Sequence, residues 1–172
     1  FRSFLSPAWF GWAGPYLTGS FGVGRGPVVY RVPFGQFGVL ICYESIFPGE
    51  SRQYRNDGAD FLINITNDAW FGHTNAPYQH YSHLVLRAIE NRVAIVRSAN
   101  TGISGWIDPL GRIRAATPIF QPAAATYALE TSDGRTLYDA WGDFVGLLSL
   151  AATLALVGSV WWTYRTERKR LA

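Results

Sequence analysis

The single cysteine of the chain, Cys42, occupies a position at which a thiol could act as a nucleophile. It ends the apolar run 37–42 and is followed by Tyr43, Glu44 and, a few residues on, Pro48. An apolar strand followed by a proline-started helix predicts a strand-to-helix turn at the carboxyl edge of a sheet, where α/β folds carry their reactive groups. The helix N-terminus would stabilise a thiolate and offer backbone N–H groups to an oxyanion. A buried structural cysteine is the alternative that composition alone favours.

Glu44, Trp70 and Phe71 are the other side chains that could take part in such a site. A carboxylate two residues after the nucleophile could support the reaction, and it could equally cap the helix that follows. Trp70 and Phe71 stand in an apolar loop after a predicted strand, where they could line the entry to the site or pack in the core. The sequence leaves both alternatives open for each of these residues.

Three histidines, His73, His80 and His83, come close together in the chain, and the last two are one helical turn apart. A zinc site would need cysteine or clustered acidic ligands nearby, and the surrounding sequence offers no such cluster. We therefore expect no metal and no cofactor. His80 is kept, together with Trp70 and Phe71, as a candidate substrate-binding residue.

The pattern of apolar residues predicts the elements that position these side chains. Short apolar runs bounded by Gly, Pro and Asn are typical of strands, and apolar residues at helical spacing are typical of helices. Strands are predicted at 28–32, 37–42, 61–66, 93–97, 105–107 and 126–129, and helices at 48–56 and 78–91. The second helix should face the core with Tyr81, Leu84, Val85, Ala88 and Ile89. Strands that alternate with helices predict a layered α/β fold with a buried sheet.

Residues 144–164 form a run of 21 residues without Asp, Glu, Lys, Arg or His. At about 1.5 Å per residue, a helix of this length spans a bilayer core of roughly 30 Å. Trp161 and Trp162 stand at one end of the run, and a basic tail, 165–170, follows. Because cations are enriched on the cytoplasmic side, we expect a membrane helix with a cytoplasmic C-terminus and residues 1–140 on the opposite side. A buried core helix of a soluble domain is the alternative.

Net charge and composition argue against a nucleic-acid-binding protein and against a disordered chain. The formal net charge of +3 comes from 15 basic and 12 acidic residues, and the tail after residue 164 carries all of the excess. Binding to nucleic acid needs clustered cations, so no nucleic acid is expected as a partner. With 48% hydrophobic and 16% charged residues, the composition is not that of a disordered chain. Because the sequence contains no Met, even at position 1, we expect a piece of a longer polypeptide.

Several short motifs follow one another along the chain. They are LICYE at 40–44, NITNDAWFG at 64–72, PYQH at 77–80, RAIENR at 87–92, RSANTGIS at 97–104 and DPLG at 108–111. In type and order, these motifs resemble the nitrilase-like domain of the apolipoprotein N-acyltransferases, over about residues 1–130. The apolar helix with its basic end resembles the last membrane span of the same family.

The resemblance implies a nitrilase-like α-β-β-α sandwich, of which this chain would be the C-terminal portion, followed by one transmembrane helix. It also implies an acyltransferase of the bacterial inner membrane with a periplasmic catalytic domain. Members of the family move an acyl chain from a phospholipid to the N-terminal diacylglyceryl-cysteine of an apolipoprotein, through a thioester on the residue that Cys42 matches. The backbone N–H of Tyr43 would then hold the oxyanion, and Glu44 would be a supporting carboxylate.

The same family needs a glutamate as general base and a lysine that stabilises the tetrahedral intermediate. The chain has one lysine, Lys169, which lies beyond the apolar segment and cannot reach Cys42. We therefore expect both residues upstream of this chain, and a fragment that is inactive alone. The expected division is 1–138 for the catalytic part, 139–164 for the linker and membrane helix, and 165–172 for the cytoplasmic tail. A membrane-tethered nitrilase-type amidase and a non-catalytic anchored interaction domain remain as alternatives.

Overall fold

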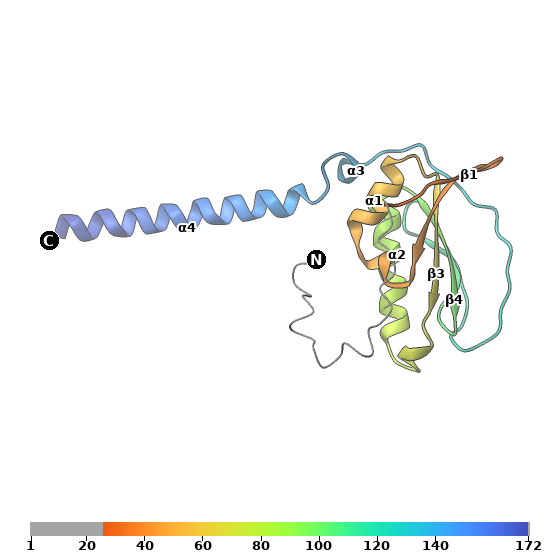
Figure 1. Ribbon diagram of the computed structural model, residues 1–172. Helices are drawn as coiled ribbons and strands as arrows, with labels where there is room; N and C mark the ends of the chain where they lie inside the picture. The colour runs from red at the N-terminus through yellow and green to blue at the C-terminus, as the bar shows by residue number, and fades with distance from the viewer. Residues whose placement is uncertain (1–25, 172) are drawn as a thin grey trace, which may run out of the picture.

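A six-stranded mixed sheet, with its strands in chain order, forms the centre of the computed structural model, which describes residues 26–171 (Figure 1). The first 25 residues of the expected catalytic part lie outside the described residues. The strands are β1 (Tyr30–Val32), β2 (Gly35–Ile41), β3 (Phe61–Asn67), β4 (Ala94–Asn100), β5 (Gly105–Ile107) and β6 (Ile113–Ala116). Neighbouring strands from β2 to β4 run parallel, and the other pairs are antiparallel. The residues that follow the parallel strands therefore meet at one edge of the sheet.

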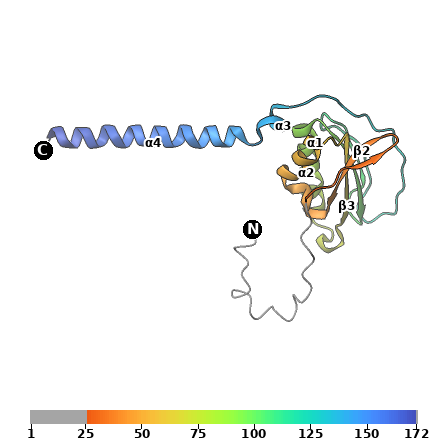
Figure 2. The same ribbon diagram turned by 45° about the horizontal axis from the view of Figure 1, so that its top comes forward.

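Two helices, α1 (Pro48–Asn56) and α2 (Ala76–Asn91), cover one face of this sheet (Figures 1 and 2). The helix predicted at 48–56 is confirmed at both ends. α2 begins two residues earlier than predicted, because Pro77 occupies its first turn, where the missing N–H of proline is not needed. The remaining helices within residues 26–171 are η2 (Cys42–Ile46), η3 (Ala69–Phe71), α3 (Leu137–Trp141) and α4 (Phe144–Leu171).

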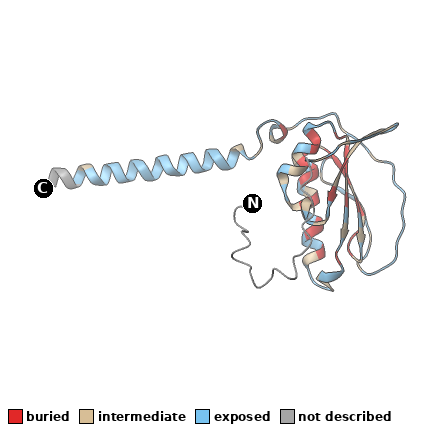
Figure 3. Ribbon diagram, viewed as in Figure 1, coloured by how far each residue is buried: buried red, intermediate tan, exposed pale blue. Residues whose placement is uncertain are grey.

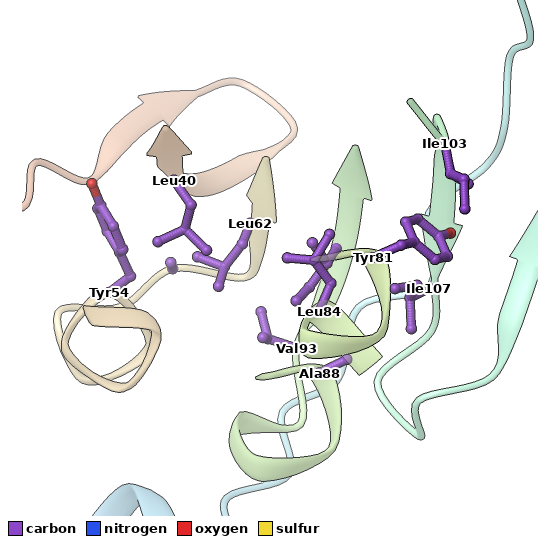
Figure 4. Close-up of a cluster of buried hydrophobic side chains, with 11 residues drawn as sticks. Leu40, Tyr54, Leu62, Tyr81, Leu84, Ala88, Val93, Ile103 and Ile107 are labelled. Carbon is purple, nitrogen blue, oxygen red and sulfur yellow. The ribbon is translucent and has the colours of Figure 1, made fainter. Parts of the chain in front are cut away.

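The hydrophobic core lies between the sheet and these two helices (Figures 3 and 4). From α2, Tyr81, Leu84 and Ala88 face inward as predicted, and Val85 packs partly buried against them. Ile89 was expected to face inward, but it is 44% exposed, because it lies at the margin of the stripe that the other three residues form. The strands and α1 contribute Leu40, Tyr54, Leu62, Ile95 and Ile107, and the connecting loops contribute Ala59, Val93 and Ile103.

The second face of the sheet is also apolar. Tyr30, Phe37 and Phe61 stack across the first three strands, with ring centroids 5.4 and 5.5 Å apart. Ile41 and Ile65, on the same face, are 58% and 45% exposed. Parallel strands normally have both faces covered, so this face suits a further layer. The predicted α/β class is confirmed, and the described residues contain one sheet of the α-β-β-α sandwich with its helix layer.

The last strand differs from the prediction. Residues 126–129 are extended chain outside the sheet, and Tyr127 packs its ring against Trp106 of β5 at 6.3 Å. The sixth strand is instead Ile113–Ala116, which pairs with β5. The reason is the turn at Asp108, whose carboxylate accepts two backbone N–H groups at 2.9 Å and reverses the chain.

Two arginines of α1 hold the linker that leads to the last helix. Nε of Arg52 donates to the carbonyl oxygens of Tyr138 and Asp139, both at 2.9 Å. Nη2 of Arg55 donates to the carbonyl oxygen of Ser132 at 2.6 Å. These bonds fasten the linker to the helix layer of the domain.

α4 leaves the domain on the side of the helix layer and extends away from it (Figures 1 and 2). Its stretch Phe144–Glu167 is long and apolar enough to cross a membrane, with a mean hydropathy of 2.0 over its most apolar part. None of that part is buried in the protein. The exposure of this apolar stretch favours a membrane span over the buried core helix of a soluble domain.

We expect Gly38→Ala to lower the free energy of unfolding of the intact protein by about 1–3 kcal/mol. Gly38 of β2 lies against the ring of Tyr54, and a Cβ at this position would come within 2.3 Å of a ring carbon. Urea unfolding in detergent measures the change. Gly49→Ala in α1 is the matched control, because nothing lies within 4 Å of its Cβ position and alanine favours a helix. Equal effects of the two substitutions would contradict the close packing on β2.

Candidate active site

Cys42 is the first residue after β2 and opens η2. Its φ of +51° lies in the left-handed region, which residues other than glycine occupy at a cost of about 1–3 kcal/mol. This sharp turn leaves the thiol partly exposed at the carboxyl edge of the sheet. The predicted strand-to-helix turn is confirmed, with the difference that a 3₁₀ helix stands between Cys42 and α1.

Glu44 acts on the same turn. Its Oε2 accepts a hydrogen bond from the backbone N–H of Ile41 at 2.6 Å and so caps the start of η2. The carboxylate thus caps the turn that carries Cys42 rather than α1, the helix considered in the sequence. Its supporting role in a reaction stays a prediction.

Two apolar grooves meet at Cys42, with Trp70 between them. The larger, of about 700 Å³, lies on the side of the helix layer, and the other, of about 650 Å³, lies along the end of β3. The first is lined by Ile41, Cys42, Tyr43, Glu44, Phe47, Trp70 and Phe71, and the second by Ile41, Cys42, Ile65, Thr66, Asn67, Ala69 and Trp70. A long hydrocarbon chain could lie in either groove with its end at the thiol.

Trp70 and Phe71 come from η3, the short helix that follows β3. Trp70 is 76% exposed, so core packing does not explain it. Phe71 is half-buried, with its ring 5.8 Å from that of Trp70 and 6.0 Å from that of His80. Both aromatic side chains border the groove beside Cys42. Their role at the entry for substrate stays a prediction.

A buried polar cluster lies behind the Cys42 turn. The carboxylate of Asp68, at the end of β3, contacts Nδ1 of His80 at 3.0 Å and pairs with the guanidinium of Arg97 from β4. Thr66 donates its hydroxyl to the same carboxylate at 3.1 Å. The side chains of the three charged or ionisable residues are at most 2% exposed. A buried charge needs such partners, so the cluster joins the end of β3, the middle of β4 and α2.

His80 belongs to this cluster and not to the wall of a groove. The residue is 3% exposed, and its Nε2 lies 3.0 Å from Oγ of Ser45 and 3.2 Å from the carbonyl oxygen of Cys42. The sequence suggested that His80 contacts substrate, but both ring nitrogens face protein groups. Its burial therefore points to a role inside the protein.

Burial lowers the pKa of His80, and the cation of Arg97 lowers it further. Hydrogen bonding to Asp68 acts in the opposite direction without outweighing them. The imidazole is therefore neutral near pH 7. Burial likewise raises the pKa of Tyr81, whose ring lies 5.7 Å from the guanidinium of Arg97, to about 12.

Tyr43 has two separate features at the site. Its ring is 49% exposed and lies 5.2 Å from that of His80. Its backbone N–H is in the first turn of η2, where no carbonyl of the helix itself can accept it. This N–H is the group that, by the family resemblance, is expected to donate a hydrogen bond to the oxyanion.

Sequence reasoning missed four members of the site: Ser45, Asn64, Asp68 and Arg97. The available signal was a polar residue within an apolar strand, as Asn64 is in FLINIT and Arg97 in AIVRSA. β3 and β4 place these two directly opposite each other. Among the described residues, no group of three or more His, Cys, Asp or Glu side chains is placed to hold a metal ion.

The family model described as carbon-nitrogen hydrolase matches residues 5–137, which is most of the chain. The chain belongs to the carbon-nitrogen hydrolase family. Its crystal-structure neighbours include an amidase from Nesterenkonia sp., with a TM-score of 0.48 and 22% sequence identity over 58% of this chain and 40% of that one.

Within this family, the relatives it resembles are apolipoprotein N-acyltransferases. The one from Geobacter metallireducens is 51% identical over 109 residues, 63% of this chain and 21% of that protein. Those from Chlorobaculum tepidum and Bdellovibrio bacteriovorus are 43% and 34% identical, over 70% and 84% of this chain and 23% and 27% of theirs. The chain thus spans about a quarter or less of the length of these relatives. The resemblance noted in the motifs is confirmed.

We expect acidification below a pH of about 6.5 to destabilise the intact protein in part through His80. The pKa of His80 is lowered in the folded state, so the unfolded state binds the proton more readily. The stabilisation is therefore complete above the unfolded pKa and is lost as the pH falls below it, towards the folded pKa. Melting temperatures measured between about pH 7 and pH 5 should fall less steeply in His80→Gln than in wild type.

His83→Gln, one turn further along α2, serves as the control for this measurement and should keep the wild-type slope. An identical slope in His80→Gln and wild type would show that His80 does not bind its proton differently in the two states.

Proposed function

We propose that this chain is the Cys42-bearing part of an apolipoprotein N-acyltransferase, which moves an acyl chain from a phospholipid to the N-terminal diacylglyceryl-cysteine of an apolipoprotein. The observation that carries the proposal is the strained Cys42 turn at the meeting point of two apolar grooves. The identity to apolipoprotein N-acyltransferases in the same region supports it. An aqueous amide substrate would not need grooves of this apolar character.

In the first half-reaction, the thiolate of Cys42 attacks the ester carbonyl of the phospholipid. A carbon–sulfur bond forms, and the carbonyl oxygen becomes an oxyanion to which the backbone N–H of Tyr43 donates a hydrogen bond. The tetrahedral intermediate then collapses to a thioester and expels the alkoxide of the lysophospholipid, which takes up the proton that the general base had removed from the Cys42 thiol. The acyl chain stays in a groove beside Trp70 and Phe71, with its first carbon on the thiol.

In the second half-reaction, the α-amino group of the lipid-modified cysteine attacks the thioester. A carbon–nitrogen bond forms, the carbon–sulfur bond breaks, and the thiolate of Cys42 returns to its initial state. The general base removes the proton from the amine. Two grooves at one thiol fit two successive lipid substrates, because the acyl chain can occupy one while the acceptor enters by the other.

In our proposal, the general base and the lysine that stabilises the tetrahedral intermediate come from outside this chain. The resemblance calls for a glutamate as base and a lysine at the tetrahedral intermediate, and we propose that both lie upstream. Lys169 stands near the end of α4, beyond the apolar stretch, and cannot serve. Glu44 supports the nucleophile by capping its turn. The 172-residue chain by itself is then expected to be inactive.

The membrane is the proposed setting of the reaction. We propose that α4 spans the bacterial inner membrane, with residues 1–138 in the periplasm and the tail 165–172 in the cytoplasm. The segment 139–164 comprises the linker and the spanning helix. Its exposed apolar surface and the cations that follow it support this orientation.

Incubation of the intact protein in detergent with a phospholipid labelled in its acyl chain should place the label on Cys42. The bond should be a thioester, cleaved by hydroxylamine and located by mass spectrometry of the peptide. Cys42→Ala should carry no label, because no other thiol is available in this part of the protein. A peptide with an N-terminal diacylglyceryl-cysteine should then take the label as an amide.

The outcomes separate the alternatives. An acyl-enzyme that releases its label to water and never to the peptide would identify an amidase-type hydrolase. No label on Cys42 in the intact protein would leave a non-catalytic anchored domain. Label that persists in Cys42→Ala would show that the nucleophile is another residue.

Trp70→Ala should raise the KM for the phospholipid by roughly tenfold or more, because the exposed ring would otherwise bury its surface against the acyl chain. The rate at saturating phospholipid should change much less. Trp141→Ala is the matched control, since that ring is 64% exposed but lies in α3, away from the grooves. An equal effect of both substitutions on KM would argue against a groove-specific contact.

A further inference from the structure

The carbonyl oxygen of Cys42 is surrounded by polar side chains from three elements. Oγ of Ser45, in η2, lies 3.0 Å from it, and Nδ2 of Asn64, in β3, donates to it at 3.3 Å. Nε2 of His80, in α2, lies 3.2 Å from the same oxygen. Asn64 and Ser45 are fully buried and His80 nearly so. This convergence fixes the carbonyl of Cys42 towards the interior.

The direction of this carbonyl determines the direction of the next N–H group. In a trans peptide, the C=O and the N–H of the following residue point in opposite directions, and the described residues contain no cis peptide. A Cys42 carbonyl that points inward therefore turns the N–H of Tyr43 outward, to the side on which the grooves meet. The left-handed φ of Cys42 is the backbone conformation that permits this orientation beside the thiol.

His80 is itself held in place from behind. Its neutral ring carries one proton, which on Nε2 is donated to the Cys42 carbonyl, so that Nδ1 is the acceptor. Nη2 of Arg97 lies 3.2 Å from Nδ1 and also pairs with the carboxylate of Asp68, whose Oδ1 lies 3.0 Å from the same nitrogen. Gly102 packs so closely on Asp68 that a Cβ there would come within 2.3 Å of the carboxylate. The ring can therefore neither rotate nor shift without breaking contacts of a fully buried ion pair.

We infer that His80, held by Asp68, is a positioning residue that orients the Cys42–Tyr43 peptide so that the N–H of Tyr43 donates to the oxyanion. This inference rests on the proposed role of Cys42 as the nucleophile. His80 acts through the backbone and not on the thiol, because its ring nitrogens face Asp68 on one side and the Ser45–Cys42 pair on the other. A positioning role predicts that variants of His80 lose acylation of Cys42 but keep its alkylation. A general structural role or a general-base role does not predict this difference.

The test compares two reactions of Cys42 in the intact protein in detergent. Acylation by p-nitrophenyl butyrate passes through a tetrahedral oxyanion, whereas alkylation by iodoacetamide occurs at a saturated carbon and forms none. His80→Asn keeps an amide near Nδ1 but withdraws from the turn, and His80→Gln places its amide near Nε2. His83→Gln is the matched control on the same helix. Each acylation is read as the butyryl mass on the Cys42 peptide.

We expect His80→Asn to slow acylation by about 100-fold, the effect of losing one oxyanion donor, while alkylation stays within about threefold of wild type. His80→Gln should recover at least tenfold of that loss, and His83→Gln should match wild type in both reactions. Acylation at the wild-type rate in His80→Asn would overturn the inference. So would parallel losses in acylation and alkylation, since they would mean that the whole turn has moved.

Labelled phospholipid, run beside the p-nitrophenyl ester, separates this inference from the proposed function. If wild type takes butyrate but not the phospholipid acyl chain, and His80→Asn still loses acylation selectively, the positioning role stands and the lipid substrate does not. If phospholipid acylates wild type and His80→Asn equally well, the proposed function stands and the positioning role fails. If neither donor acylates Cys42 in wild type, both are wrong.

Discussion

The buried carboxylate of Asp68 ties together the elements that surround the site. It pairs with Arg97 of β4 and contacts His80 of α2 and Thr66 of β3, and its side chain is fully buried. Leaving such a charge without its partners would cost several kcal/mol, so the end of β3, the middle of β4 and the first half of α2 must keep one arrangement around it. Gly102 belongs to the same constraint, because the chain passes too close to Asp68 for any side chain.

The Cys42 turn depends on this arrangement. A left-handed conformation costs a residue other than glycine about 1–3 kcal/mol, which contacts elsewhere must offset. Here Asn64 and Ser45 bond the carbonyl of Cys42, which the turn directs inward, and Glu44 bonds the N–H of Ile41 in front of it. Each side of the turn is thus fixed by a side chain, and the strain is held at the residue whose thiol meets the grooves.

Much of the fold followed from the pattern of residues. The helix at 48–56 and the strands on either side of it were predicted because Pro48, the Asp57-Gly58 pair and the apolar runs are local signals. The strand predicted at 126–129 was wrong because strand formation needs a partner, and the turn at Asp108 brings 113–116 to β5 first. The prediction that Ile89 faces the core was wrong for a similar reason. Helical spacing indicates which face of a helix is apolar, but it does not say which residues at the edge of that face are buried.

By itself the sequence determined Cys42, the aromatic residues beside it and the apolar helix with its basic end, because each is a local property of neighbouring residues. The family followed as well, from motifs in a fixed order. Only the tertiary structure decided that His80 is buried, that Asn64 and Arg97 stand opposite each other, and that Asn64 bonds the Cys42 turn while Arg97 pairs with Asp68 behind it. These residues are far apart in the chain, and their contacts exist only once parallel strands and α2 share one edge. The physical reason is that a buried polar side chain is defined by its partners, which folding alone brings together.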